Sequence, residues 1–342
     1  MLTLTELANI MTWTLGPEMY RQNNRAAVLA AKVPLKVSGG PKASWPIQTG
    51  AGATAVEVAE GSDVISAEYV DSVEQRPELD WAELRSAFSM SDRAISTAQN
   101  ANAGDPAMIF DLFGEKILQA STGIATKVNS LLYAGTGTAT FDGASVASIV
   151  GLSAALANSG DYAGITRASY TNFYGNVVAN GGVARPLSLD LMSQLDANIF
   201  TACNATDYDI YTTPTVKRRY EDIFESRRFT TAGGGLGSED VSWRGKPINR
   251  DKDCTSGRMY FVNPAYLELA CCPPPNVTME QFNKRLTNIA GTADGKTFNA
   301  TMIPAQVVLL GKTGSAVKGY LSCLVQLKAK RPNSMGYISD IA

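Results

Sequence analysis

The sequence predicts an α+β fold in which a long helix lies against a sheet, with an extended arm and a hairpin attached. Three observations support this prediction. Residues 106–134 carry apolar side chains at every third or fourth position, which is typical of an amphipathic helix. Residues 306–342 contain strand-like runs separated by glycine turns, and these runs need another element to pack against. Residues 1–82 contain too few large apolar side chains for a core of their own.

The predicted long helix has clear signals at both ends. Asp105 is a good N-cap residue, Pro106 suits the first helical position, and Gly135 suits the stop. At about 1.5 Å per residue the helix is about 42 Å long, enough to act as a strut across a domain. Gly114 and Gly123 each weaken it by about 1 kcal/mol relative to Ala, so packing must stabilise it. Its apolar stripe consists of Ile109, Phe113, Ile117, Ala120, Ile124, Val128 and Leu131.

The N-terminal part of the chain is predicted to be extended. Residues 1–46 form an arm, because prolines and glycines interrupt the chain repeatedly between Pro34 and Pro46. Residues 47–82 form a long hairpin that turns around residues 61–63. An isolated hairpin is marginally stable in water, so we expect both segments to lie on something else.

The predicted hairpin is strongly acidic. Nine acidic residues lie between Glu57 and Glu83, against Arg76 alone. One interpretation is a solvated acidic loop. The other is an arm that lies on a basic surface of a neighbouring molecule.

The middle of the chain alternates short helices and strands. Residues 144–157 are predicted to form a weak helix, and residues 187–204 a stronger one capped by Ser188. Residues 207–214 are predicted to form a buried strand, and a helix begins after Pro214. The apolar face of the stronger helix consists of Leu191, Leu195 and Ile199.

The stretch "SWRGKPINRDKDCTSGRMYFVNP" (residues 242–264) has the pattern of a scaffold. It predicts two neighbouring strands, 242–250 and 258–263, joined by a polar turn at residues 253–257. The Asn-Pro pair at its end is expected to terminate the sheet and start a helix.

Composition excludes several classes of function. With 30 Lys and Arg against 32 Asp and Glu, the formal net charge is −2, so no global positive field attracts nucleic acid or an anionic membrane. The absence of histidine excludes Ser-His-Asp triads, Cys-His pairs and His-ligated metals. The five cysteines contain no C-x-x-C pair and are predicted to be buried, reduced thiols. Charged residues make up 18%, which indicates either a surface largely covered by partners or an Ala/Gly/Ser-rich domain.

Two glycine-containing stretches resemble nucleotide-binding motifs only in part. Gly311-Lys312-Thr313 follows a strand like the end of a P-loop, but Gln306 stands where that pattern requires glycine. The stretch "AGGGLGSED" has Ser238 at the last glycine position of G-x-G-x-x-G. We therefore predict no catalytic residue, no cofactor-binding residue and no metal ligand, and the protein is not expected to be an enzyme.

Neither a membrane span nor a signal peptide is predicted. No apolar run approaches about 20 residues, and the N-terminus lacks a basic start followed by a long apolar block. We expect synthesis in a cytoplasm and no membrane partner.

The order of elements from Gly164 to Leu269 resembles that of major capsid proteins of tailed bacteriophages, which share the Hong Kong 97-type fold. The matching blocks are "GITRASYTNFYGNVV", "LSLDLMSQLDANIF", "DYDIYTTPTVKRRYEDIFESRRF" and "WRGKPINRDKDCTSGRMYFVNPAYLEL". The family pattern is a strand that leads into a helix with aromatic and basic residues, then a G-x-P-[IV] strand, an Asp-rich turn and a "YFLN-P" strand. The positions that carry it here are Gly245, Pro247, Ile248, Asp251, Gly257, Tyr260, Phe261, Asn263 and Pro264.

The resemblance implies five regions and a structural role. The regions are an N-terminal arm (1–46), an extended hairpin loop (47–82), a peripheral domain with a spine helix (83–150), an axial domain (151–305) and returning strands of the peripheral domain (306–342). The implied function is a major capsid protein that assembles into hexamers and pentamers of an icosahedral phage head around double-stranded DNA. It would be made in the host bacterial cytoplasm and located in the virion.

The resemblance also implies partners. These are other copies of the chain, a portal protein, a separate scaffolding protein, an optional decoration or cement protein, and packaged double-stranded DNA bound non-specifically. Because the sequence begins at Met1, scaffolding is expected from a separate protein. Two alternatives are an encapsulin-like bacterial nanocompartment shell and an enzyme or ligand-binding α+β domain.

Charge predicts where copies of the chain touch. The hypothesis is that Glu57, Glu60 and Glu68 of the hairpin rest on basic positions of a neighbour. The first candidates are Lys217, Arg218, Arg219, Arg227 and Arg228, followed by Lys328, Lys330 and Arg331. Some shells of the family join a hairpin lysine to a neighbour's asparagine, but no lysine occurs here between Lys42 and Lys116. We therefore expect non-covalent shells.

Overall fold

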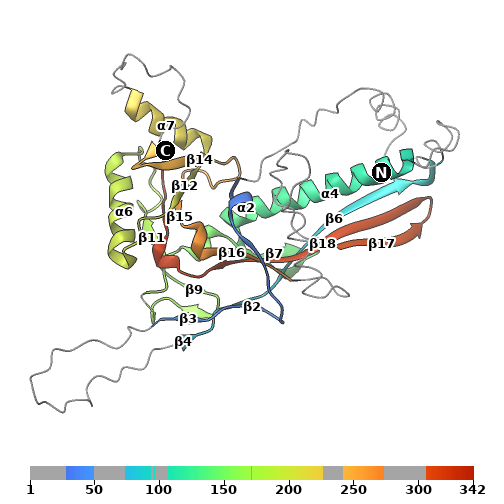
Figure 1. The fold of residues 1–342 in the computed structure, drawn as a ribbon, viewed down its shortest axis with the longest axis horizontal. Coiled ribbons are helices and arrows are strands. Elements are labelled where there is room, and N and C mark those ends of the chain that lie inside the picture. Colours follow the sequence, from blue (N-terminus) through green and yellow to red (C-terminus); the bar gives the residue numbers. More distant parts are fainter. Residues whose placement is uncertain are drawn as a thin grey trace, which may run out of the picture.

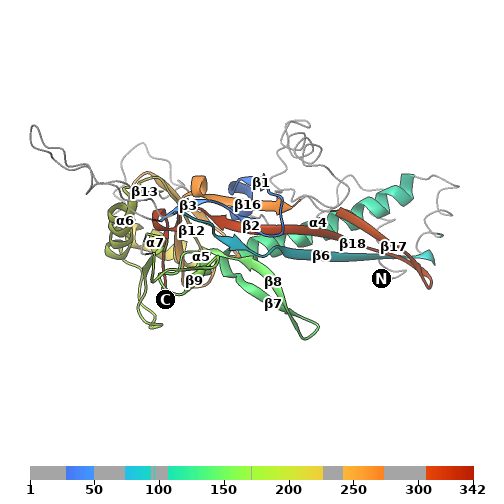
Figure 2. The same ribbon diagram turned by 90° about the horizontal axis from the view of Figure 1, so that it is seen from below.

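A computed structural model describes residues 28–49, 74–93, 96, 107–170, 172–225, 242–272 and 306–342. Within these residues the chain forms a long, thin body with two main sheets placed side by side along its longest axis (Figures 1 and 2). A five-stranded sheet and a long helix form one half, and a six-stranded sheet with two helices forms the other. The α+β prediction is confirmed.

The five-stranded sheet is built around one long strand near the C-terminus. This is β18 (Ala316–Ala329), which pairs antiparallel with β6 (Ala82–Ser91) along one edge. Its other edge pairs first with β17 (Gln306–Thr313) and then with β16 (Leu267–Cys272). β1 (Leu35–Val37) adds a parallel edge strand to β16. The sheet therefore joins the arm to the C-terminal part of the chain.

The helix α4 (Ala107–Ala134) runs along this sheet, as predicted (Figure 1). Of the predicted stripe, Ala120, Ile124 and Val128 are buried, whereas Leu131 is half-buried and its neighbour Leu132 is fully buried. The side chains of Ile109, Phe113 and Ile117 lie outside the described residues. The helix and its packing on the C-terminal strands are both confirmed.

Gly135 ends α4, and the reason is a close approach of two backbones. Its N–H donates to the carbonyl of Leu131 at 2.8 Å. A Cβ atom at this position would lie only 2.1 Å from the carbonyl oxygen of Ile149 and 2.6 Å from that of Leu131. Only glycine lets the backbone of Ile149 pass so near to the last turn of the helix.

The predicted weak helix at 144–157 is wrong for most of its length. Residues Ala144–Val150 form strand β8, which pairs with β7 (Thr136–Phe141). The connecting Asp142 and Gly143 both have positive φ angles, 49° and 77°, as a two-residue hairpin turn requires. Only α5 (Leu152–Ala155) is helical. The Asp-Gly turn signal outweighs the weak helical pattern of Ala and Ser.

The six-stranded sheet has the order β11–β19–β15–β12–β14–β13. These strands are β11 (Asn176–Val178), β19 (Gly336–Ile338), β15 (Met259–Val262), β12 (Asp209–Thr212), β14 (Lys246–Arg250) and β13 (Ser242–Trp243). The predicted buried strand is β12. It pairs in parallel with β14 and antiparallel with β15.

The expected pairing of strands 242–250 and 258–263 is therefore wrong. β12 lies between them, because Ile210 and Tyr211 are fully buried and need strand partners on both edges. Arg244 and Gly245, which both have positive φ angles, form a turn that divides the predicted strand 242–250 into β13 and β14.

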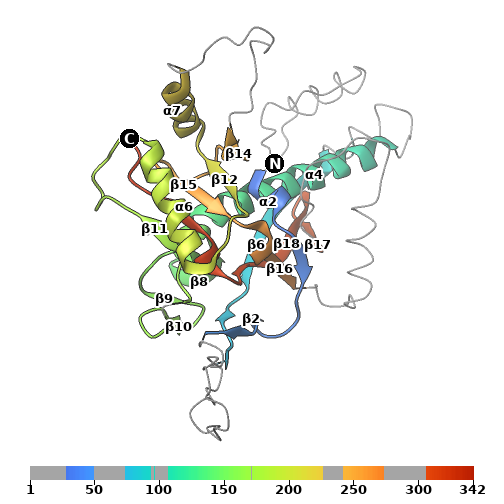
Figure 3. The same ribbon diagram turned by 60° about the vertical axis from the view of Figure 1, so that its left-hand side comes forward.

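Two helices flank this sheet (Figure 3). α6 (Leu189–Cys203) has Ser188 as its N-cap, whose hydroxyl accepts from the N–H of Leu191, as predicted. It packs on β11 and β19 with Met192, Leu195 and Ile199 buried, while Leu191 is half-buried. α7 (Pro214–Glu225) starts at the expected proline and buries Val216 and Tyr220.

The Asn263-Pro264 pair does end β15, but the expected helix is only one turn. The side chain of Asn263 accepts from the N–H of Ala265, and η1 (Pro264–Tyr266) is a single 3-10 turn. The chain then continues directly into β16, so this turn carries it from the six-stranded to the five-stranded sheet.

Two strands belong to a different sheet from the other strands of their expected region. β16 belongs to the five-stranded sheet although it falls within residues 151–305, and β19 belongs to the six-stranded sheet although it falls within 306–342. η2 (Pro332–Ser334) is the short turn between β18 and β19. The chain therefore passes from one sheet to the other twice, at η1 and again at η2.

Short elements complete the described chain. The arm contributes α2 (Val28–Lys32), β2 (Ala43–Ser44) and β3 (Ile47–Gln48); β4 (Glu74–Gln75) pairs with β3, and β5 (Glu78–Leu79) with β2. These antiparallel pairs form the base of the predicted hairpin, whose turn at 61–63 lies outside the described residues. β9 (Asp161–Tyr162) and β10 (Ile165–Thr166) form a small hairpin.

All five cysteines are free thiols. Cys254, Cys271 and Cys323 are buried, as predicted, whereas Cys203 and Cys272 are half-buried. Burial raises the pKa of Cys323 to about 12 and also raises that of Cys254 and Cys271. In the described part of the chain, no helix is long and apolar enough to cross a membrane.

Candidate assembly surfaces

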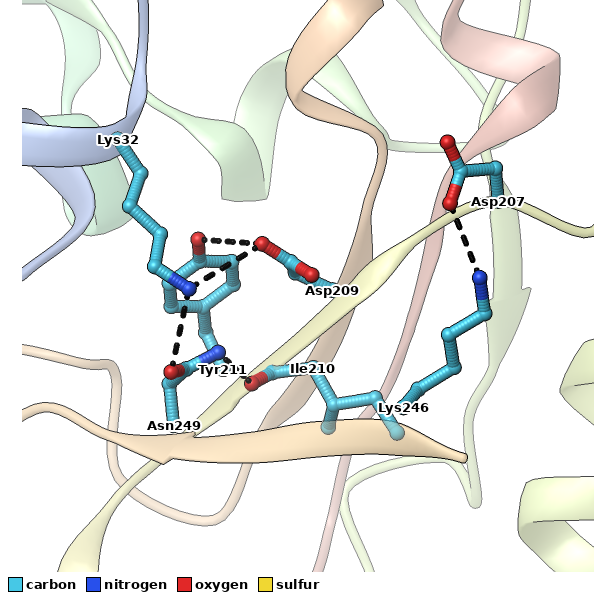
Figure 4. Close-up of polar contacts among 7 residues, drawn as sticks. All are labelled: Lys32, Asp207, Asp209, Ile210, Tyr211, Lys246 and Asn249. Carbon is cyan, nitrogen blue, oxygen red and sulfur yellow. Dashed lines mark hydrogen bonds and ion pairs between the residues drawn. The ribbon is translucent and has the colours of Figure 1, made fainter. Parts of the chain in front are cut away.

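Helix α2 of the arm is held to its own chain by a polar cluster on the six-stranded sheet (Figure 4). Nζ of Lys32, at the end of α2, lies 3.3 Å from a carboxylate oxygen of Asp209 and 3.3 Å from the amide oxygen of Asn249. The hydroxyl of Tyr211 donates to the same Asp209 oxygen at 3.3 Å. Asn249 in turn donates to the carbonyl of Ile210 at 3.2 Å, which fixes its orientation.

A buried carboxylate lies at the centre of this junction. Asp251 is 2% exposed and accepts hydrogen bonds from Nδ2 of Asn129 at 3.1 Å and from the hydroxyl of Tyr133 at 3.0 Å. The N–H groups of Leu29 and Asp253 also donate to it, at 3.4 and 2.9 Å. Burial and the nearby Asp251 raise the pKa of Tyr133, so its hydroxyl remains a donor. One side chain thus joins α2, α4 and the turn after β14.

The arm also contributes apolar side chains to the core. Leu29, Ala30, Val33, Ala43 and Trp45 are all buried in the cluster that includes α4 and the five-stranded sheet. The expectation that the arm and hairpin lie on something else is therefore met, for residues 28–49 and 74–82, by the core of the same chain. The arm contributes isolated apolar side chains to a core that other segments form. Its own sequence therefore shows no apolar pattern that predicts this packing.

The base of the hairpin is held to the same core. Leu79 and Ala82 are buried, and Nε1 of Trp81 donates to the carbonyl of Gly40 at 3.0 Å. The guanidinium of Arg76 donates twice to the hydroxyl of Ser44, at 2.9 and 3.1 Å. Residues 50–73 between these anchors lie outside the described residues, and so do the predicted contact residues Glu57, Glu60 and Glu68.

The predicted basic partners of the hairpin fall on two different surfaces. Lys217 is half-buried on α7, and Arg218 and Arg219 are exposed on it. Arg227 and Arg228 lie outside the described residues. Figures 1 and 3 place α7 and strand β2, at the base of the hairpin, at opposite sides of the molecule.

The second group of candidates forms a compact ionic cluster. Lys328 is 3% exposed and lies 3.9 Å from a carboxylate oxygen of Glu268, so its role as a contact for a neighbour is contradicted. Its Nζ donates to the hydroxyl of Ser38 at 3.0 Å and to the carbonyl of Ser44 at 3.3 Å. Burial lowers the pKa of Lys328.

Two further lysines reach the same glutamate. Nζ of Lys330 lies 2.5 Å from Glu268, and Nζ of Lys36 lies 3.5 Å from it. Arg331 follows and is exposed, with its guanidinium 5.4 Å from the ring centre of Tyr266. Sequence reasoning named Lys330 and Arg331 but missed Lys36 and Glu268, because strand pairing alone brings these together.

The hairpin of β7 and β8 is a third exposed feature, and it projects away from the body of the molecule (Figure 2). The register places Phe141 opposite Ala144 and Ala139 opposite Val146, so these four side chains share one face. Phe141 is 74% exposed. The Asp-Gly turn is a sequence signal that could have identified this hairpin.

The described residues contain no group of three or more His, Cys, Asp or Glu side chains that could hold a metal ion. The P-loop-like Gly311-Lys312-Thr313 lies within strand β17, which turns directly into β18 at Gly314. No helix N-terminus follows these residues, so the backbone does not have the geometry that holds phosphates in a P-loop.

No protein-family model matches this sequence, and no curated protein matches it either. Solved structures do match it over nearly the whole chain, at low identity. The chain is similar to the capsid asymmetric unit of cyanophage A-1(L), at 18% identity and a TM-score of 0.68, covering 94% of this chain and 95% of that one.

Two further shells match in the same way. The capsid of an empty GTA particle is 12% identical, with a TM-score of 0.59 and 96% of each chain covered. The SrpI encapsulin of Synechococcus elongatus PCC 7942 is also 12% identical, with a TM-score of 0.56, covering 97% of this chain and 95% of that one.

Each of these matches covers 94% or more of this chain, so the similarity concerns the fold as a whole and not one sheet alone. The class of fold is thereby defined: it is that of shell-forming capsid proteins. The chain has the Hong Kong 97-type capsid fold, and the resemblance inferred from its sequence is confirmed at the level of the fold.

Proposed function

We propose that this chain is the major capsid protein of a tailed bacteriophage. Copies of it assemble into hexamers and pentamers, and these form an icosahedral head around double-stranded DNA. The observation that carries the proposal is the match to the cyanophage A-1(L) capsid over 94% of this chain. A structural role, with no catalysis, follows from this assignment, and the mature protein is located in the virion.

The partners follow from the same proposal. A portal protein occupies one vertex, a separate scaffolding protein guides assembly, and a decoration or cement protein is an optional addition. DNA is held without sequence preference. A net charge of −2 supports this last point, because phosphate binding increases with the number of exposed Lys and Arg side chains.

An encapsulin-like nanocompartment is the second candidate. The match to the SrpI encapsulin over 97% of this chain supports it. A phage capsid and an encapsulin differ in what the shell contains. Genes for a terminase and a portal beside this gene favour the phage, and a gene for a cargo protein favours the nanocompartment.

Electron microscopy tests the proposal directly. The full chain is expressed alone and together with its gene neighbours, and the products are imaged in negative stain. We expect large, uniform, closed particles in at least one of the two preparations. A chain that stays small and soluble in both preparations would contradict the proposal.

The interface hypothesis belongs to this proposal as well. Acidic residues of the hairpin, including Glu57, Glu60 and Glu68, contact basic positions of a neighbouring copy. Lys217, Arg218, Arg219, Arg227 and Arg228 remain one candidate receiving set. Charge reversal of Arg218 and Arg219 tests this set, and unchanged particle yield would exclude these two residues.

A further inference from the structure

Helix α2 is too short to be stable by itself. It has five residues, Val28–Lys32, and isolated helices shorter than about 12 residues are marginal in water. Its first turn is capped by side chains distant in sequence. The N–H of Leu29 donates to a carboxylate oxygen of Asp251 at 3.4 Å, and that of Ala30 donates to the amide oxygen of Asn129 at 3.2 Å. We therefore expect α2 to be helical only while it is docked on the rest of the described chain, which we call the body.

The docking site on the body does not depend on α2. Without the arm, the carboxylate of Asp251 still accepts from the hydroxyl of Tyr133 at 3.0 Å and from the N–H of Asp253 at 2.9 Å. Strand β16 still pairs with β18 along its other edge, over its whole length from Leu267 to Cys272. Departure of the arm segment would therefore leave these contacts of the body in place.

Strand β1, which follows α2, is a short edge strand. Its ladder with β16 covers three residues, Leu35–Val37. The N–H of Ser38 adds one bond, to the carbonyl of Cys271 at 2.9 Å. Lys36 lies 3.5 Å from Glu268, but the side chain of Lys36 is 61% exposed, and exposed ion pairs stabilise little. Few polar contacts therefore hold this strand on the sheet.

A glycine pair, Gly39-Gly40, separates β1 from a part of the arm that is anchored more firmly. Gly40 has a φ angle of 111°, which residues with a side chain rarely adopt. Its carbonyl accepts from Nε1 of Trp81 at 3.0 Å, which fixes this point to the hairpin base. Trp45 follows and is buried in the core. The glycine pair is therefore the position at which residues 28–38 can turn away while the rest of the described arm stays in place.

Residues 28–38 contact both sheets. On the six-stranded sheet, Nζ of Lys32 lies 3.3 Å from Asp209 of β12 and 3.3 Å from Asn249 of β14 (Figure 4). On the five-stranded sheet, β1 pairs with β16. The chain itself crosses between the sheets at η1 and η2, which are single 3-10 turns. Residues 28–38 are therefore a further connection across a junction that short turns bridge.

We propose that residues 28–38 form a strap that docks and detaches as one unit while the body stays folded, and that the docked strap fixes the relative orientation of the two sheets. Burial of Leu29, Ala30 and Val33 is the main force that keeps the strap docked. The acceptors Asp251 and Asn129 select its position, because they bond only to a first turn of α2 that faces them. The inference concerns the single chain and does not depend on the proposed shell function.

Hydrogen exchange of the unassembled full chain tests whether the strap detaches by itself. We expect the amide groups of residues 29–37 to exchange at least about tenfold faster than those of β18 and of residues 120–134 in α4, because the strap opens without global unfolding. Equal exchange in the strap and in α4 would overturn the proposal, since the strap would then open only when the whole molecule unfolds.

One buried charge separates docking of the strap from folding of the body. Val33→Asp places a carboxylate at a position that is 4% exposed, so the strap should detach and exchange like an unprotected chain. The body should still melt cooperatively, with exchange in α4 within about threefold of the natural chain. The matched control Lys36→Gln changes an exposed strap residue and should leave the strap docked. Loss of protection in α4 together with the strap would contradict a separate unit.

Distances between spin labels test whether the docked strap fixes the sheets. The labels are placed at two exposed positions, Arg85→Cys on β6 and Gln194→Cys on α6. The half-buried thiols are removed by Cys203→Ser and Cys272→Ser. We expect one narrow distance distribution with the natural strap and a distribution at least about twofold broader with Val33→Asp, because the two halves can then turn relative to each other. Equal widths would show that the strap does not fix the orientation of the sheets.

Discussion

Asp251 shows how a single residue can join segments that are far apart in sequence. Its carboxylate accepts from Asn129 and Tyr133 on α4 and from the N–H of Leu29 on the arm. Asn129 also contacts the arm directly, because its side-chain oxygen accepts from the N–H of Ala30 at 3.2 Å. Because these donors are buried, removal of the carboxylate would take this partner from the hydroxyl of Tyr133 and the N–H of Leu29, whereas Asn129 would keep Asp253 at 2.9 Å.

Replacing Asp251 by Ala should lower the free energy of unfolding by about 3 kcal/mol, since several buried donors are left unsatisfied. The measurement is denaturant unfolding of the unassembled chain. Asp207→Ala is the matched control, because Asp207 pairs with Lys246 while 88% exposed and such pairs contribute about 0–1 kcal/mol. Equal losses in the two variants would contradict the central role of Asp251.

Asp340 predicts a dependence of stability on pH. The N–H groups of Asn180 and Gly182 donate to its carboxylate at 2.7 and 3.2 Å, and they lower its pKa below the ordinary value. A lowered carboxylate pKa contributes stability above the unfolded pKa, and this contribution is lost as the pH falls through the folded pKa. The free energy of unfolding should therefore decrease more steeply between pH 6 and pH 3 for the natural chain than for Asp340→Asn. Identical slopes would show that Asp340 contributes nothing.

At the scale of elements, the long helix α4 agrees with its sequence pattern, whereas the hairpin after it does not. The cap, stripe and stop of α4 all act within a few residues, so a local pattern describes them. The helix predicted at 144–157 is wrong over β8 because Ala and Ser discriminate poorly between helix and strand, whereas the Asp142-Gly143 turn favours a hairpin. The strand order β15–β12–β14 depends on pairing partners distant in sequence, which no local pattern specifies.

Two glycines of the α4 region should respond in opposite ways to alanine. A Cβ at Gly123 would meet only the hydroxyl of Ser86 at 3.6 Å, so Gly123→Ala should stabilise the chain by about 1 kcal/mol through helix propensity. Gly135→Ala would force a Cβ to 2.1 Å from the carbonyl of Ile149 and should destabilise it by about 1–3 kcal/mol. Thermal unfolding of the two variants checks both signs, and a shift in the same direction would be inconsistent with the packing described.

At the scale of the whole molecule, the described parts of the arm and hairpin are anchored within their own chain, and the predicted contact residues of the hairpin lie between the anchors. Residues 28–49 and 74–82 bury side chains in the common core. Removal of the segment between them should therefore leave the fold intact. Under the proposed function, the same removal should prevent assembly.

The paired strands β3 and β4 allow a precise version of that deletion. Gln48 lies opposite Glu74, so replacing residues 49–73 by Asn-Gly closes the ladder with a two-residue turn. We expect a folded, soluble chain with a cooperative melting transition that forms no shells in electron micrographs. Normal particles from this variant would show that the segment is dispensable for assembly.

Shells of this protein should lack covalent links between copies. No lysine occurs between Lys42 and Lys116, so residues 47–82 contain no amine side chain to attack a neighbour. Denaturing gels of mature particles should show one band near the chain mass of 36.4 kDa. A ladder of heavier bands would contradict this prediction.

The sequence by itself determined the features that depend on neighbours a few residues away. These are the long helix with its stop at Gly135, the Ser188 cap of α6, the start of α7 at Pro214 and the extended form of the arm after Pro34. Only the tertiary structure decided that the arm packs into its own core, that β12 separates β14 from β15, and that Lys36, Lys328 and Lys330 surround Glu268. The reason is physical: caps and stripes are local, whereas burial and strand pairing depend on contacts between residues far apart in the sequence.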